Sequence, residues 1–271
     1  MTSYKLLLLL LFSSITTIFS QAQDTTAIDS LNNVIIQATT IEAKIDALIA
    51  LGNQYRNTDK DKFIDYTEQA ADLAQKNNME EKWGKIIFSK IPFWMYNGEV
   101  DKGIAIAHTL LDFHTVNKNE DEILNIKNAL GVLHNNKGNT KKSIDYYNQI
   151  ITHPLCKENT KLYTRTLMNL GIALIYDKQY KKAANHLLEA IKRYEQSDSP
   201  KKQESIAIAY LYLGQVHEQL YDYTTAINHI QKCYDILSTN NTSLSYQLEA
   251  LRNIVNIYHI QEKYKAALLA H

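Results

Sequence analysis

The chain has 271 residues, of which 45% are hydrophobic and 21% are charged, and its 29 basic and 29 acidic side chains cancel to a formal charge of zero. Because this balance leaves no basic excess to neutralise phosphates, it disfavours nucleic acid as a main partner, and the apolar content excludes a disordered chain. Only 8 Gly and 3 Pro interrupt the many helix-forming residues. The composition therefore predicts an all-α protein with short turns.

Residues 1–22 have the pattern of a secretory signal peptide. Lys5 supplies a positive charge ahead of the apolar run at residues 6–12, and residues 20–22 have the small-x-small form that signal peptidase accepts. We therefore predict cleavage before Gln23, export and a periplasmic location. An uncleaved membrane anchor is the alternative, but the apolar stretch is shorter than the ~20 residues that span a bilayer. Residues 23–271 contain no second apolar span.

A capping helix is predicted for residues 23–42. Leu31, Val34, Ile35 and Ala38 recur there at helical spacing. Such a helix would cover the apolar face of the first unit of the array that follows.

The rest of the chain, residues 43–271, repeats itself at a period of about forty residues. Four copies carry a glycine directly after a leucine, and two degenerate copies fit the same frame around Ile91 and Val255. In three copies a small residue follows the glycine by twelve positions and a large residue follows by sixteen. The glycines are Gly52, Gly131, Gly171 and Gly214; the small residues are Ser143, Ala183 and Ala226; the large residues are Tyr147, Leu187 and Ile230. Since a glycine inside a helix costs ~1 kcal/mol relative to alanine, this column indicates close approach of a neighbouring helix.

This pattern resembles the tetratricopeptide repeat, whose signature joins Leu-Gly-x-x-Tyr to Ala-x-x-x-aromatic. The signature is met best at residues 168–190 and 210–233. The resemblance implies a right-handed α-solenoid of antiparallel helix pairs, with five repeats and a truncated sixth. A period near forty also suits a HEAT-like array, but the aligned columns favour the tetratricopeptide reading.

The sixth copy stops early. His271 occupies the column of Leu187 and Ile230, and the last residues leave an apolar face where a solenoid end needs a polar cap. We therefore predict that the sequence is the N-terminal part of a longer protein. A natural terminus with a frayed last helix, or with a dimer contact, is the alternative.

The sequence was searched for catalytic and nucleotide-binding motifs, and none was found. It contains no glycine-rich nucleotide loop and no Gly-x-Ser-x-Gly elbow, so we predict no catalytic residue, no cofactor and no metal site. His134 and His217 fall in the aromatic column of the first helix and are expected to pack. His186 and His229 share one register on neighbouring copies, where they either face each other or lie on a solvated face.

The two cysteines are expected to be free thiols. Cys156 and Cys233 lie about two repeats apart, whereas a disulfide needs Cα atoms within ~7 Å. Cys233 falls in the column of small residues and is predicted to be buried, while Cys156 lies in a joint between repeats and is predicted to be exposed.

An aromatic segment in the second copy has two interpretations. Residues 83–96 contain Trp83, Phe88, Phe93, Trp94 and Tyr96, which either pack in the core or form a hydrophobic docking site. Pro92 is predicted to kink or interrupt the helix there.

The resemblance also implies a binding surface. In the family, the first helix of each pair lines a concave face that holds an extended peptide or a partner helix, and here Asn and Gln could pair with a peptide backbone while Tyr could stack. Arg165 with Asn169 partly resembles a clamp for a C-terminal carboxylate, although Asn128 and Val132 stand where that clamp needs Lys and Asn. The predicted partner-binding residues are Asn53, Phe88, Tyr96, Asn128, Asn135, Arg165, Asn169, Tyr176, Gln215, Glu218, Arg252 and Asn256, with His259 at the end of the same face.

We therefore expect an exported, non-catalytic scaffold that binds a protein or peptide. The alternative is a sensor, because a signal peptide followed by a long repeat array resembles the extracytoplasmic front half of bacterial sensor kinases and membrane-bound transcription regulators, a layout common in Bacteroidetes. In that case the kinase or regulator domain would follow His271.

Overall fold

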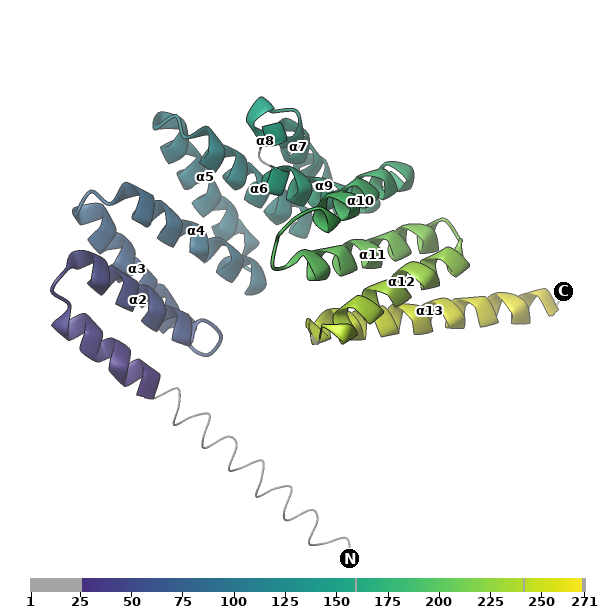
Figure 1. Cartoon of the computed structure of the whole chain (residues 1–271), viewed down its shortest axis with the longest axis horizontal. Coiled ribbons are helices and arrows are strands. Elements are labelled where there is room, and N and C mark those ends of the chain that lie inside the picture. Colours follow the sequence, from purple (N-terminus) through teal and green to yellow (C-terminus); the bar gives the residue numbers. More distant parts are fainter. Residues whose placement is uncertain (1–25, 159, 241, 270–271) are drawn as a thin grey trace, which may run out of the picture. The chain divides into compact units, whose positions relative to one another are not determined.

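The computed structural model describes residues 26–158, 160–240 and 242–269, and Figure 1 shows a succession of helices joined by short turns. No strand occurs in these ranges, and the predicted all-α class is confirmed. The predictions for the signal peptide at residues 1–22 and for the chain end at His271 lie outside the described residues. Two compact units, residues 1–106 and 107–271, divide the chain.

The first unit begins with a helix at residues 26–37, whose Ile35 packs against the core around Ile45 and Leu48. Three complete helices follow, α2 (Ile41–Tyr55), α3 (Lys60–Lys76) and α4 (Glu80–Tyr96), and then the start of α5 (Val100–Val116). Thr40 caps α2 and Asp59 caps α3 by accepting hydrogen bonds from backbone N–H groups of the first turn.

Pro92 does not interrupt its helix, so that part of the prediction is wrong. α4 runs from Glu80 to Tyr96 with Pro92 inside it. Ile91, Phe93 and Trp94 beside the proline are buried. Their packing outweighs the one backbone hydrogen bond that a proline removes.

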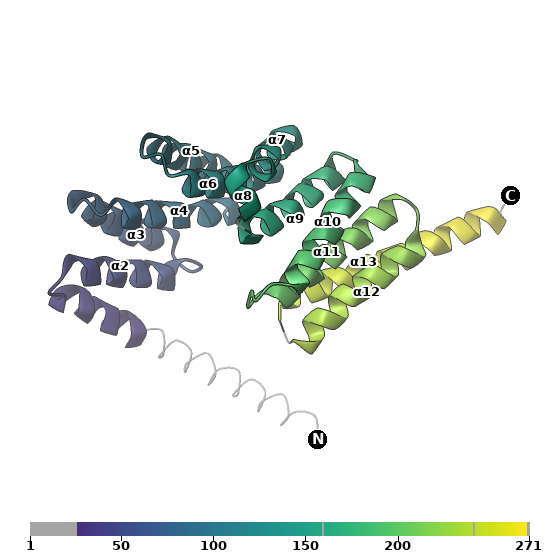
Figure 2. The same ribbon diagram turned by 45° about the horizontal axis from the view of Figure 1, so that its top comes forward.

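The second unit is a stack of antiparallel pairs, α6 with α7, α9 with α10 and α11 with α12, followed by a long last helix. Figure 2 shows the last two of these pairs side by side. The helices are α6 (Glu120–Asn136), α7 (Thr140–Ile151), α8 (Pro154–Glu158), α9 (Thr160–Tyr176), α10 (Tyr180–Glu195), α11 (Lys202–Gln219), α12 (Tyr223–Thr239) and α13 (Leu244–Leu269). We call α2, α4, α6, α9, α11 and α13 the A helices, and α3, α5, α7, α10 and α12 the B helices.

A three-residue turn joins α6 to α7, α9 to α10 and α11 to α12. At the first of these turns the N–H of Asn139 donates to the carbonyl oxygen of His134 at 2.8 Å, and Gly138 has φ +81°. The same 6→1 bond recurs from Gln179 to Leu174 at 2.8 Å. This is the Schellman ending of a helix, which satisfies otherwise unpaired carbonyl groups and reverses the chain.

The glycine column makes the predicted close contact. A Cβ added to Gly131 would lie 2.4 Å from Cε1 of Tyr147, and one added to Gly214 would lie 2.3 Å from Cγ1 of Ile230. In each case the neighbour is the large residue sixteen positions further on, which lies on the B helix of the same pair. The glycines therefore let each of these B helices lie directly on its A helix, and the predicted frame is confirmed for the copies at Gly131, Gly171 and Gly214.

The last helix departs from the repeat. Residues 261–263 stand where the earlier pairs turn, but α13 continues through them to Leu269, so no separate B helix begins at Tyr264. Gln261, Glu262 and Lys263 are good helix formers, which favours continuation of the helix through this point.

Candidate functional site

The A helices of the second unit form one layer. α6 contacts α9, α9 contacts α11, and α11 contacts α13. The predicted binding residues of this unit lie on these four helices, so the layer brings side chains together that are far apart in the sequence.

A polar ladder joins α6 to α9 within this layer. Asn128 is 4% exposed, its amide Nδ2 donates to Oγ1 of Thr166 at 3.0 Å, and its Oδ1 accepts from Nδ2 of Asn169 at 3.3 Å. Thr166 is fully buried and donates in turn to the carbonyl oxygen of Leu162. Three polar groups thereby satisfy one another inside the stack. Asn128 therefore supports the wall of the layer, and its amide is not free to contact a ligand.

Arg165 lies beside this ladder. It is half-buried, and its Nη2 donates to Oδ1 of Asn125 on α6 at 2.9 Å, while its Nε is buried without a partner. Burial lowers the pKa of Arg165, and it forms no ion pair with a carboxylate among the described residues. A guanidinium taken out of water without an opposite charge has unused capacity for an anion.

Glu218 on α11 is the acidic counterpart of Arg165 in this layer. It is half-buried, and burial raises the pKa of its carboxyl group. In the part of the chain that the structure describes, it makes no ion pair. Gln215, one turn before it, is also half-buried. The layer therefore holds a half-buried cation and a half-buried anion, on neighbouring A helices, that do not pair with a charged side chain among the described residues.

Aromatic side chains accompany these charges. Tyr176 at the end of α9 is 62% exposed. Tyr212 on α11 is half-buried, and burial raises its pKa above the ordinary range, with further contributions from Tyr246, Tyr176 and Glu249. Tyr176 is thus free to stack against a ligand.

The remaining predicted residues are divided between exposed and half-buried positions. In the second unit, Arg252 and Asn256 are exposed on α13, and Asn135 on α6 is half-buried with its Oδ1 lacking a partner. In the first unit, Asn53 is exposed and Phe88 is half-buried.

The aromatic segment of the first unit is divided between core and surface. Phe93 and Trp94 are buried, and the ring of Phe93 lies 4.1 Å from that of Phe63 and 5.2 Å from that of Trp94. Core packing is therefore the correct reading for these residues. Tyr96 is 82% exposed and alone of the three offers a surface for docking.

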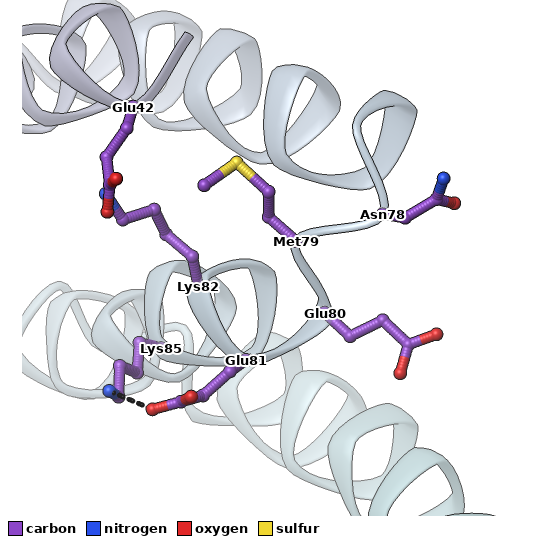
Figure 3. Close-up of a pocket in the computed structure, with 7 residues that line it drawn as sticks. All are labelled: Glu42, Asn78, Met79, Glu80, Glu81, Lys82 and Lys85. Carbon is purple, nitrogen blue, oxygen red and sulfur yellow. Dashed lines mark hydrogen bonds and ion pairs between the residues drawn. The ribbon is translucent and has the colours of Figure 1, made fainter. Parts of the chain in front are cut away.

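One pocket was not predicted from the sequence. It has a volume of about 510 Å³ and lies between the starts of α2 and α4 (Figure 3). Burial alone would lower the pKa of Lys82, but hydrogen bonds to Asp46 at 2.7 Å and Glu42 at 3.1 Å outweigh it, so the pKa is raised. Lys85 pairs with Glu81 at 2.5 Å. These pairs neutralise the lysines, so neither is left with a charge aimed at a ligand. The lining residues are Glu42, Asn78, Met79, Glu80, Glu81, Lys82 and Lys85.

Both thiols are free and buried. Cys233 is fully buried as predicted, and burial raises its pKa to about 12. Cys156 is also fully buried, on α8, so its predicted exposure is wrong. The joint between α7 and α9 folds into this short helix, and the helix packs its cysteine into the core with Leu162. Burial raises the pKa of Cys156 as well, so neither thiol is poised as a nucleophile.

Several histidines pack against neighbouring rings. His134 is 5% exposed and stacks on Tyr146, with ring centroids 5.7 Å apart, as its column predicted. The ring of His229 lies 5.2 Å from the ring of His217 and stacks on Tyr210. Among the described residues, no three His, Cys, Asp or Glu side chains are placed to hold a metal ion.

No helix in the described ranges combines the length and the apolar composition needed to cross a membrane.

Comparison with known proteins bears on the fold. The tetratricopeptide repeat family matches residues 164–197, which correspond to the pair α9 and α10. A search of curated proteins found no significant match. Among solved structures, BtubC (BKLC) from P. vanneervenii is 16% identical with a TM-score of 0.66, covering 82% of this chain and 91% of its own.

Two further similar structures were solved with a bound molecule. NprR in complex with its cognate peptide NprX is 14% identical with a TM-score of 0.60, covering 95% of this chain and 83% of its own. Rap protein complexed with Competence and Sporulation Factor is 15% identical with a TM-score of 0.57, covering 92% and 74%. At these identities the comparisons show a shared fold.

Proposed function

We propose that this tetratricopeptide-repeat protein is a non-catalytic scaffold, and that it binds an extended peptide segment along the A helices of its second unit. The fold supports the proposal, since NprR has been solved with its cognate peptide on the same fold. Among the described residues, the predicted binding side chains of the A layer are amides, one phenol and the separate charges of Arg165, Glu218 and Arg252.

The observation that carries the proposal is the pair of unmatched charges on α9 and α11. Arg165 and Glu218 are both half-buried, and the pKa of each is shifted by burial toward its neutral form. A ligand that brings a carboxylate or backbone carbonyl to Arg165 and a cation to Glu218 would compensate both groups. Tyr176 adds an exposed ring for stacking. We therefore expect a peptide with a basic residue or an amino terminus as the ligand.

An array of random twelve-residue peptides tests this expectation with the mature chain, residues 23–271. Wild-type protein should bind a subset rich in Lys or Arg, and Glu218→Gln should bind that subset at least tenfold more weakly, since losing one partner of a desolvated charge pair costs more than ~1.4 kcal/mol. Tyr221→Ala is the matched control, because Tyr221 is 73% exposed in the turn before α12, outside the layer. Equal binding by wild type and Glu218→Gln would contradict the proposal.

We also propose that the chain is exported, either as a free scaffold or as the extracytoplasmic sensor part of a histidine kinase or transcription regulator. The apolar leader at residues 1–22 supports export, and NprR, named a quorum sensor, supports a sensing use of the fold. Alkaline phosphatase fused after His271 should be active in cells, and deletion of residues 6–12 should abolish that activity. Fluorescence from a green fluorescent protein fusion at the same place, with inactive phosphatase, would overturn export.

A further inference from the structure

Two histidine rings meet at the contact between α11 and α12. The ring of His217 on α11 lies 5.2 Å from that of His229 on α12, which also stacks on Tyr210 of α11 with centroids 5.7 Å apart. Both histidines are half-buried. The ammonium group of Lys232, three residues after His229, lies 5.2 Å from the centre of the Tyr210 ring. Two imidazoles and a lysine are thus gathered at one helix contact.

Asp222 fixes the first of these rings. It caps α12, since one carboxylate oxygen accepts from the backbone N–H of Thr225 at 3.2 Å, and the other oxygen lies 3.2 Å from Nδ1 of His217. Hydrogen bonds from Thr225, with a smaller contribution from His217, hold the pKa of Asp222 below its usual value. Because a carboxylate only accepts, Nδ1 of His217 is the donor. Asp222 is therefore engaged on both oxygens and can compensate a proton on His217.

His229 lacks such compensation in the described part of the chain. Its Nδ1 is buried without a hydrogen-bond partner, so a proton there would bury an unpaired N–H. Burial lowers the pKa of His229 most, and the charges of His217 and Lys232 lower it further. Asp222 raises it by less than any of these lowers it, and Glu249 on α13, which also packs against α12, is not among the groups that shift it. A proton on His229 therefore costs the folded pair free energy.

The repeat contains a comparison pair with a single imidazole at this contact. In register, His217 and His229 correspond to His134 on α6 and Tyr146 on α7, whose rings stack with centroids 5.7 Å apart. A tyrosine thus fills the position of His229 in a pair of the same geometry. Packing alone does not require the second histidine.

We propose that the contact between His217 and His229 is a pH-sensitive switch that loosens the α11–α12 pair in acid. In the unfolded chain, His229 binds a proton near the ordinary pKa of 6.5, whereas in the folded pair it binds one only at lower pH. The stability that the neutral ring contributes is therefore complete above pH 6.5 and is lost as the pH falls through the folded-state pKa. Below that point both rings carry positive charge at 5.2 Å and repel.

Hydrogen–deuterium exchange of the whole chain tests the proposal, because exchange reports local opening. Between about pH 7.5 and about pH 5, after correction for intrinsic rates, the protection of α12 should fall about tenfold further than that of α7. His229→Tyr, which copies the α6–α7 contact, should remove this extra loss, and so should His229→Gln. His186→Tyr is the matched control. His186 has the same register on α10 and burial lowers its pKa, but the residue in register with His217 there is Leu174, so the response of α12 should persist.

Nuclear magnetic resonance titration tests whether the two rings act as a pair. The imidazole signal of His229 should titrate with a midpoint below pH 6.5, and His217→Gln should move that midpoint upward by removing a neighbouring positive charge. Each variant is first shown to keep the helical circular dichroism of the wild type at pH 7.5. Equal loss of protection in α7 and α12 overturns the proposal, as does a wild-type response in both His229 variants. A midpoint that His217→Gln leaves unchanged overturns the pairing.

Discussion

Replacing Gly214 by Ala should destabilise this chain by about 2 kcal/mol, while the same change at Gly52 should stabilise it by about 0.5–1 kcal/mol. Both glycines occupy the same column of the repeat, and both substitutions gain up to ~1 kcal/mol of helix propensity. At Gly214, however, the new Cβ would lie 2.3 Å from Cγ1 of Ile230 and 3.1 Å from the carbonyl oxygen of Ala226. Overpacking of this kind costs ~1–3 kcal/mol or more.

The two positions differ in what the new methyl group meets. Ile230 is fully buried and, being β-branched, has few alternative rotamers, so it cannot move away. At Gly52 the nearest atoms are Cγ2 of Thr67 and Cβ of Tyr66, both at 3.4 Å, which is close to ordinary contact.

Urea unfolding followed by circular dichroism measures both changes. A second substitution provides the internal control: Gly214→Ala combined with Ile230→Ala should cost less than the sum of the two single changes, because shortening Ile230 makes room for the methyl group. Equal effects at Gly52 and Gly214 would show that propensity alone governs this column, and would contradict the packing account.

The repeat could be predicted because packing enforces it. Gly131, Gly171 and Gly214 must be small wherever a large residue of the B helix lies on them, so the interface leaves a periodic trace in the sequence. The family match at residues 164–197 lies in this region of the array. Positions of this kind need only residue size and spacing to be recognised.

Other features depend on contacts that no spacing encodes. Pro92 remains inside a helix because the buried residues on either side of it hold the helix together. Cys156 is buried because the joint at residues 154–158 folds into a short helix. Five residues are too few to show a helical pattern in the sequence. α13 runs on past the expected turn, from Leu244 to Leu269.

The sequence predicts which residues of the candidate site share a face, but it does not predict which of them are buried and hydrogen-bonded. The sequence register assigns Asn128, Arg165 and Asn169 to one face, but it does not reveal that the side-chain amide of Asn128 is hydrogen-bonded to Thr166 and Asn169. The side chain of Asn128 is 4% exposed and that of Tyr176 is 62% exposed, and this difference depends on the neighbouring helix. The repeat register therefore predicts which residues are candidates for binding. Hydrogen bonds within the protein decide which of these side chains remain available to a ligand.

The burial and hydrogen bonding of Asn128 lead to a second prediction. Asn128→Ala should lower the free energy of unfolding by about 2–3 kcal/mol, because it leaves buried partners unpaired and opens a small cavity. Thr166 loses the donor to its Oγ1, and Asn169 loses the acceptor for its Nδ2. Asn53→Ala is the matched control: Asn53 is an exposed asparagine on an A helix of the first unit, and its replacement should change stability by less than ~0.5 kcal/mol.

A double-mutant cycle with Thr166→Val separates the bond from the cavity. Thr166→Val keeps the shape of the side chain and removes its oxygen, so the two changes together should cost about 1 kcal/mol less than their sum. Purely additive costs would show that the bond between Asn128 and Thr166 contributes nothing. Peptide binding by Asn128→Ala, measured well below its melting temperature, should stay within threefold of wild type, because the amide supports the wall and does not touch the ligand. A tenfold loss of binding in that folded variant would instead place Asn128 in direct contact with the peptide.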